Sequence, residues 1–150
     1  VKDREFLPAS EAASLWSGDS LQIGISVPQA DMFRANNDGI QETAYAEFGV
    51  AADNRSWVWA SMNLNRMPLA APIPKLISKS TVADGTQCYR VAIPWESLNI
   101  RYRTGLTLKL SVLVNDRDRA GRHWLEWFGG IADGKDPGAY GEAMILEKRK

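Results

Sequence analysis

The stretch from residue 106 to residue 130 constrains the fold of this chain more than any other part of the sequence. Apolar residues occupy every second position from residue 106 to residue 114. Because side chains on a β-strand point alternately to its two faces, this pattern predicts a long strand with one apolar face. A polar turn containing Gly121 follows, and the residues after it include two tryptophans but no obvious catalytic group. We therefore expect a β-hairpin, and its return strand favours a binding surface over an active site.

Further short strands with the same period recur along the chain. The pattern predicts strands over residues 21–27, 44–51, 56–62, 77–82, 87–93 and 143–146. Turn signals separate them, including Asn36-Asn37-Asp38-Gly39 and Asp84-Gly85, and only residues 11–13 and 94–98 suggest helical turns. A chain of 150 residues is long enough to bury a core without metals or disulfides. The sequence thus predicts an all-β fold, a single antiparallel β-sandwich of two packed sheets, jelly-roll or immunoglobulin-like, spanning residues 1–150.

Composition excludes several classes of partner. Eighteen basic and eighteen acidic residues leave no net charge, so we expect no nucleic acid and no anionic membrane surface as a partner. No run of apolar residues reaches the length that a membrane span requires. A single cysteine, Cys88, cannot form an internal disulfide. Because the sequence starts at Val1 without an initiator methionine, we expect it to be part of a longer protein.

Catalytic motifs are missing from the sequence. His123 is the only histidine, it falls within a predicted strand, and no Gly-x-Ser-x-Gly motif is present. Two pairs of carboxylates could in principle hydrolyse a glycoside, Asp116 with Asp118 and Glu126 with Asp133. Aspartates are common in hairpin turns because they cap the backbone, which is the simpler interpretation of the first pair. We therefore predict that the chain is not an enzyme.

One segment resembles a cation loop. Asp116-x-Asp118-x-Ala120-Gly121 matches the first half of a helix-loop-helix calcium loop, but Ala120 and Trp127 stand where two further oxygen ligands belong. No zinc spacing and no phosphate-binding loop is present. The chain is thus predicted to require no cofactor, and a structural calcium ion held partly by backbone carbonyls is the alternative to a simple turn.

Six tryptophans remain to be explained. Trp95 and Trp127 have the parity and setting of core anchors. Trp16 precedes a strand in a polar Ser-Gly-Asp loop, where its ring either lies against a sugar or closes the end of the sandwich. The parity of three others leaves open whether they join the core or form an exposed aromatic strip: Trp57, Trp59 and Trp124.

Four segments occur along the chain in a distinctive order. They are LWSGDSLQI at 15–23, YRVAIPWESL at 89–98, VNDRD at 114–118 and KDPGAYG at 135–141. Together they resemble the family 9 carbohydrate-binding modules and their relatives over nearly the whole chain. The resemblance implies a secreted or periplasmic, non-catalytic sandwich of two antiparallel sheets, often carrying structural calcium and attached to a polysaccharide-degrading enzyme. Members of the family normally have further strands before the equivalent of Val1, so the resemblance also implies that this chain is most of a domain, or a domain whose first strands lie elsewhere.

The resemblance also implies a binding site. Trp16 matches one wall of an aromatic clamp, and Gln22 matches a polar residue that meets sugar hydroxyls. Two positions depart from the family pattern, because Gly134 stands where a second tryptophan wall is expected and Gly49 where an arginine is expected.

The leading hypothesis is therefore a module that binds a polysaccharide or oligosaccharide for an attached carbohydrate-active enzyme. In it Trp16 stacks on the sugar, while Gln22, with Asp19 or Lys135, binds hydroxyls. The alternative is a structural accessory β-sandwich that packs against a neighbouring catalytic domain without binding sugar.

Overall fold

The computed structural model describes residues 7–28, 43–51, 53–62 and 69–147 of the chain. The predicted turn at residues 36–39 lies outside them. The elements in chain order are the 3₁₀ helix η1 (Ala12–Ser17) and the strands β1 (Ser20–Pro28), β2 (Thr43–Ala51), β3 (Ser56–Met62), β4 (Ile77–Ala83), β5 (Thr86–Ala92), β6 (Thr107–Asp118) and β7 (Gly121–Trp127), then the 3₁₀ turn η3 (Pro137–Ala139) and β8 (Gly141–Met144).

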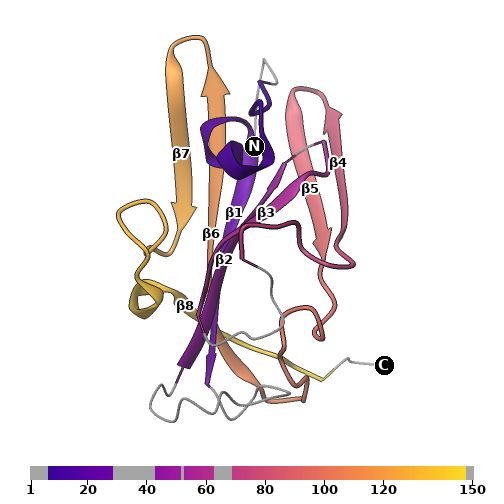
Figure 1. Cartoon of the computed structure of the whole chain (residues 1–150), viewed down its shortest axis with the longest axis vertical. Coiled ribbons are helices and arrows are strands. Elements are labelled where there is room, and N and C mark those ends of the chain that lie inside the picture. The colour runs from indigo at the N-terminus through magenta and orange to yellow at the C-terminus, as the bar shows by residue number, and fades with distance from the viewer. Residues whose placement is uncertain (1–6, 29–42, 52, 63–68, 148–150) are drawn as a thin grey trace.

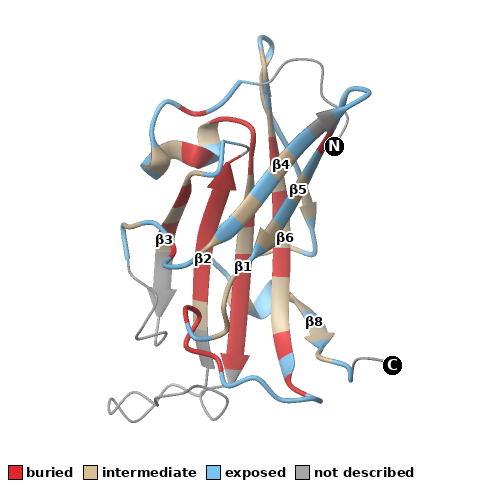
Figure 2. Cartoon of the chain, turned by 90° about the vertical axis from the view of Figure 1, so that its right-hand side faces the viewer, coloured by how far each residue is buried: buried red, intermediate tan, exposed pale blue. Residues whose placement is uncertain are grey.

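Two antiparallel sheets make up the described part of the fold (Figure 1). The large sheet has the strand order β3-β2-β1-β6-β7. Strand β8 pairs with residues 107–110 of β6 and β7 with residues 112–118, so both lie along one side of this long strand. The small sheet is the β4–β5 hairpin, which crosses one face of the large sheet (Figure 2).

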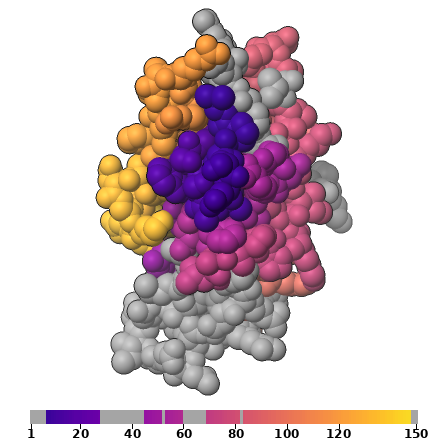
Figure 3. Space-filling view, turned by 45° about the horizontal axis from the view of Figure 1, so that its top comes forward, coloured from indigo at the N-terminus to yellow at the C-terminus, as the bar shows by residue number. Residues whose placement is uncertain are grey.

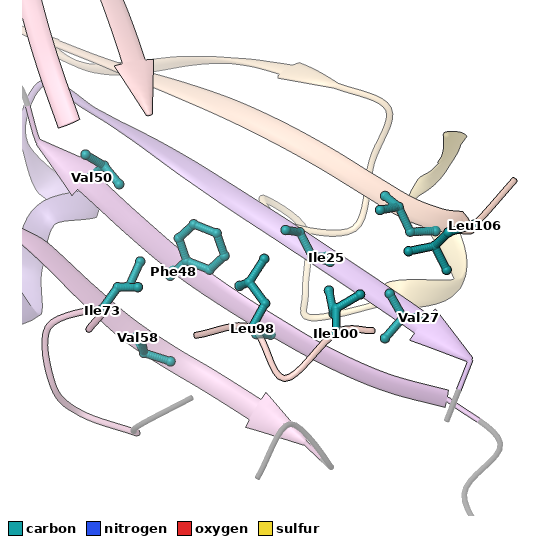
Figure 4. Close-up of a cluster of buried hydrophobic side chains, with 11 residues drawn as sticks. Ile25, Val27, Phe48, Val50, Val58, Ile73, Leu98, Ile100 and Leu106 are labelled. Atoms are coloured by element: carbon teal, nitrogen blue, oxygen red, sulfur yellow. The ribbon is translucent and has the colours of Figure 1, made fainter. Parts of the chain in front are cut away.

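The main hydrophobic core lies between the large sheet and the small one (Figure 4). The strands contribute alternate residues, such as Ile25 and Val27 on β1 and Phe48 and Val50 on β2. The connections on either side of the small sheet add further buried side chains: Ile73, Leu98, Ile100 and Leu106. The other face of the large sheet therefore carries the residues of opposite parity, and this face holds the site described below.

The structure confirms the predicted antiparallel β-sandwich and both predicted hairpins. Asp84 and Gly85 have φ values of 50° and 67°, which suit the two-residue turn that joins β4 and β5. The β6–β7 turn is as short, with Asp118 paired to Gly121. The final strand begins two residues earlier than expected, because Gly141 already pairs with Leu110.

Two tryptophans assigned to the core behave differently. Trp95 is partly buried and packs against the main core, as predicted. The prediction for Trp127 is wrong, since this residue is 61% exposed. It has the parity of the apolar face, but it lies on β7 at the edge of the large sheet. Parity along a strand reports which face a side chain occupies and says nothing about what covers that face.

Candidate functional site

A pocket of about 450 Å³ opens on the face of the large sheet that lies opposite the β4–β5 hairpin. The segment around η1 lies on this face, bordered by the β6–β7 hairpin and by the segment that follows it (Figure 3). The pocket is lined by eight residues: Trp16, Gln22, Glu47, Trp59, Arg122, Ile131, Ala132 and Lys135. Three of the predicted site residues are thus brought together, namely Trp16, Gln22 and Lys135.

A continuous chain of hydrogen bonds forms the polar floor of the pocket. Lys135 Nζ donates to Glu47 Oε2 at 2.5 Å, and Gln22 Nε2 donates to Glu47 Oε1 at 3.2 Å. Asn115 Nδ2 then donates to Gln22 Oε1 at 3.1 Å, and Arg122 Nη2 donates to Asn115 Oδ1 at 2.6 Å. Glu47, Gln22 and Asn115 are buried and lie on the three adjacent strands β2, β1 and β6. The network therefore holds two cationic side chains at fixed positions around the pocket.

Trp16 forms an exposed wall. Its side chain is 46% exposed, whereas its neighbour Leu15 is completely buried and anchors η1 to the sheet. The Arg122 guanidinium carbon lies 5.4 Å from the centroid of the Trp16 ring and 5.0 Å from that of Trp124. These are cation–π distances. Partial burial lowers the pKa of Arg122 from its ordinary value, because burial disfavours the charged form.

Trp59 forms a second aromatic part of the lining. In the pairing of β2 with β3, Glu47 faces Ala60 and Phe48 faces Val58, so Trp59 is the extra residue of a β-bulge. Its indole Nε1 donates to Ala13 O at 2.8 Å, which ties β3 to η1. The Trp59 ring lies directly over Gly49, where a Cβ atom would come within 2.3 Å of it. The position at which the family pattern expects an arginine is therefore filled by an indole from the next strand.

The loop that carries Lys135 is held by Glu126. The Glu126 carboxylate accepts hydrogen bonds from the backbone N–H groups of Ile131 at 2.7 Å and Ala132 at 3.2 Å. Gly134 has a φ of 138°, and a Cβ built there would meet no atom within 4 Å. The position where the family pattern expects a second tryptophan wall is therefore open.

Asp19, the fourth predicted site residue, does not line the pocket. It is 3% exposed, and its carboxylate accepts hydrogen bonds from the backbone N–H groups of Leu7 and Arg117. This side chain fastens the segment before η1 to the end of β6. Its burial and these hydrogen bonds give it a structural role.

Six residues of this arrangement were not predicted as site residues: Glu47, Trp59, Asn115, Arg122, Ile131 and Ala132. Glu47 carried a usable signal, since it is a charged residue between Ala46 and Phe48 in an otherwise apolar strand. The role of Trp59 depends on the bulge, which strict alternation does not reveal.

The side chains of His123, Cys88 and Glu126 do not line the pocket. The His123 side chain is 64% exposed on β7, with Asp118 Oδ1 3.8 Å from its Nε2 atom. Cys88 is exposed on β5 in the small sheet. Glu126 is engaged with the backbone of its own loop, as described above.

Asp118 closes the β6–β7 turn. Its Oδ1 atom accepts hydrogen bonds from the backbone N–H groups of Ala120 and Gly121. Among the residues that the structure describes, no group of three or more His, Cys, Asp or Glu side chains could hold a metal ion. Structural calcium therefore stays a prediction.

Comparison with solved structures identifies the fold. The chain is similar to a family 9 carbohydrate-binding module from Caldicellulosiruptor kristjanssonii in complex with glucose, with a TM-score of 0.67 and 14% identity over 99% of this chain and 68% of that one. It is also similar to a family 9 module from the same organism in complex with cellotriose, with a TM-score of 0.62 and 16% identity over 99% of this chain and 67% of that one. The fold is thus that of family 9 carbohydrate-binding modules, as the sequence resemblance implied.

No protein-family model matches the chain, and no curated protein matches it. A search of the described residues for a helix long and apolar enough to cross a membrane finds none.

Proposed function

We propose that this chain is a non-catalytic carbohydrate-binding module. In this role it brings an attached carbohydrate-active enzyme to a polysaccharide or oligosaccharide, as part of a longer secreted or periplasmic protein. The observation that carries the proposal is the exposed indole of Trp16 beside the polar floor of Gln22 and Glu47 in one pocket. A flat indole packs against the C–H face of a pyranose, while polar groups beside it bind the hydroxyls. The presence of glucose and cellotriose in the two similar structures supports the same assignment.

The expected affinity is modest. The site is open to solvent and offers only a few stacking and hydrogen-bonding groups. The costs of ordering and desolvating the sugar and the side chains that bind it offset part of the binding free energy. Dissociation constants on the order of micromolar to millimolar are therefore expected.

Titration with a panel of soluble oligosaccharides tests the proposal, with tryptophan fluorescence and calorimetry as readouts. Trp16→Ala is expected to weaken binding at least about tenfold, a loss of roughly 1.4 kcal/mol. Trp127→Ala is the matched control, because Trp127 is exposed on the face of β7 opposite Arg122 and should leave binding unchanged. Binding that survives Trp16→Ala, or a panel in which no sugar binds, would overturn the proposal.

A second candidate function is supported by a separate surface. Leu125 and Trp127 lie on β7 and Phe128 directly follows this strand, and the three residues are 73%, 61% and 50% exposed. The Trp127 and Phe128 rings contact each other, with centroids 4.7 Å apart. Such a strip fits a structural accessory domain that packs against a neighbouring catalytic domain.

The accessory function is tested in the longer protein. The double variant Leu125→Ser with Trp127→Ser should lower the melting temperature of a neighbouring domain if the strip packs against it. The same variant of the isolated chain should keep its own melting temperature. A neighbouring domain that melts unchanged would remove this candidate.

A further inference from the structure

We infer that the sugar bound in this pocket carries a carboxylate, as in a uronic acid, and that Arg122 and Lys135 bind that group. The inference rests on the proposed function and names the class of sugar.

The pocket has an excess of positive charge. Its lining contains two cationic side chains, Arg122 and Lys135, and one carboxylate, Glu47. The Glu47 side chain is 1% exposed, whereas that of Lys135 is 46% exposed. An entering ligand therefore meets the cations, while the single anion lies beneath them.

The pocket also has an excess of unused hydrogen-bond donors. The Lys135 ammonium has three N–H groups and uses one on Glu47 Oε2. The Arg122 guanidinium has five N–H groups and directs Nε and Nη2 at Asn115 Oδ1. Within the described residues, neither side chain has another hydrogen-bond acceptor.

The acceptors of the floor are already engaged. Glu47 Oε1 receives a hydrogen bond from Gln22, and Gln22 Oε1 receives one from Asn115. A hydroxyl both donates and accepts, whereas a carboxylate only accepts, so a surface of free N–H donors favours the carboxylate. Arg122 is suited to this because its planar fork can pair with both carboxylate oxygens.

The surroundings of Arg122 support the same reading. No carboxylate among the described residues forms an ion pair with it. Its guanidinium lies against the Trp16 and Trp124 rings, and its pKa is lowered by burial with no anion to offset the effect. A bound carboxylate would supply the missing counter-charge, next to the ring on which the sugar is proposed to stack.

The test compares sugars that carry a carboxylate with matched neutral sugars. Galacturonate oligomers are titrated beside their methyl esters, and glucuronic acid beside glucose, at low and high salt. The acid is expected to bind at least about tenfold tighter than its neutral partner at low salt, and the difference should shrink as salt is added.

Two variants at one position identify the group responsible. Arg122→Gln should abolish the preference for the acid, while Arg122→Lys, which keeps the charge, should retain part of it. Circular dichroism and the melting temperature report whether each variant folds. If Arg122→Gln does not fold, the double variant Lys135→Gln with Glu47→Gln, which removes the ion pair as a unit, should reduce the preference for the acid by itself.

The outcomes separate the two proposals. Neutral sugars that bind as well as the acids, or a preference for the acid that persists in Arg122→Gln, would overturn the carboxylate assignment and leave sugar binding in place. A panel in which neither acidic nor neutral sugars bind would overturn sugar binding itself.

Discussion

Glu47 shows how single residues determine this pocket. A carboxylate buried to 1% exposure loses its water, at a cost of several kcal/mol, unless hydrogen bonds and an opposite charge offset it. Gln22 and Lys135 supply both. The same contacts fix the position of Lys135 at the pocket rim, so the residue that is expensive to bury also arranges the binding surface.

Gly49 is expected to tolerate no side chain. Gly49→Ala would place a Cβ atom 2.3 Å from the Trp59 ring, and that ring is tethered to Ala13 by its own hydrogen bond. We expect a loss of about 1–3 kcal/mol in the free energy of unfolding, as for other overpacked sites, together with weaker sugar binding. Urea denaturation and titration measure the two effects.

Gly129→Ala is the control for this prediction. Its nearest contact would be Ala139 Cβ at 3.8 Å, an ordinary van der Waals distance. It should therefore stay within about 0.5 kcal/mol of the parent chain. Equal effects of the two substitutions would show that the ring does not occupy the space over Gly49.

Because Tyr140 is buried, we expect the free energy of unfolding to depend on pH in the alkaline range. Tyr140 is 3% exposed, and its hydroxyl has no hydrogen-bond partner among the described residues. Burial, with a smaller effect from Glu47, raises the pKa of Tyr140 well above its ordinary value of 10.0. The unfolded chain ionises near pH 10 and the folded chain does not, so the contribution of this group to stability is complete below pH 10 and is lost as the pH rises beyond it.

Tyr140→Phe should remove this dependence. At pH 7 the variant is expected to match or exceed the parent chain in stability, because it removes an unsatisfied buried hydroxyl. Urea denaturation between pH 8 and 11 should then show a steeper decline for the parent chain. Parallel curves would show that this hydroxyl ionises equally in the folded and the unfolded chain. A variant that is about 1 kcal/mol or more less stable at pH 7 would indicate a hydrogen bond at this hydroxyl.

At the scale of elements, the sequence predicted well where the strands lie, but it predicted poorly which of their side chains other elements cover. Alternation identified the hairpins and the strand that became β6, because a half-buried strand needs one apolar face. It failed for Trp127, since nothing local to β7 reports that the small sheet leaves this edge exposed. It also could not place the Trp59 ring over Gly49, because that contact arises from a bulge in the pairing of β2 with β3.

The site was predictable only in part: residues in local motifs were found, whereas residues that join the site through strand pairing were not. Trp16, Gln22 and Lys135 follow from motifs along the chain, and they meet in the pocket. Arg122 and Asn115 become parts of it only through the pairing of β6 with its neighbours, which brings residues from distant segments into hydrogen-bond contact. Register between strands is set by the whole sheet, so a local pattern does not contain it.

The contribution of the turn between β2 and β3 to the stability of the fold should decrease at low pH. Arg55 pairs with Asp53 and also donates to the backbone oxygens of Ala9 and Ser10, so the pair fastens the turn to the segment before η1. The hydrogen bond from the Arg55 side chain lowers the pKa of Asp53 below its ordinary value of 3.8. Its contribution to stability is therefore present above pH 3.8 and is lost as the pH falls through the lower, folded-state pKa.

Asp53→Asn measures that contribution. Both partners are partly exposed, so the parent chain should be more stable than the variant by less than about 1 kcal/mol at pH 6. The difference should shrink in denaturant titrations as the pH falls below 3.8. A difference that stays constant across this range would show that the carboxylate does not contribute through its charge.

At the scale of the whole molecule, the pocket exists only when the fold is complete. Its lining comes from η1, from β1, β2, β3 and β7, and from the loop after β7, and β6 joins its floor through Asn115. The main core between the two sheets holds these strands in place without contributing to the pocket. The unfolded chain therefore has no comparable site, and a bound sugar stabilises the folded state alone.

Ligand binding is thus expected to raise the melting temperature. A sugar at 100 times its dissociation constant adds about 2.7 kcal/mol to the free energy of unfolding, which corresponds to a rise of roughly 5–11 °C for a domain of this size. Differential scanning fluorimetry measures the shift, and Trp127→Ala should reproduce it. Trp16→Ala should show at most about half of this rise at the same concentration, because a tenfold weaker affinity reduces the gain to about 1.4 kcal/mol. A sugar that titration shows to bind, but that raises the melting temperature of Trp16→Ala as much as that of the parent chain, would bind somewhere other than this pocket.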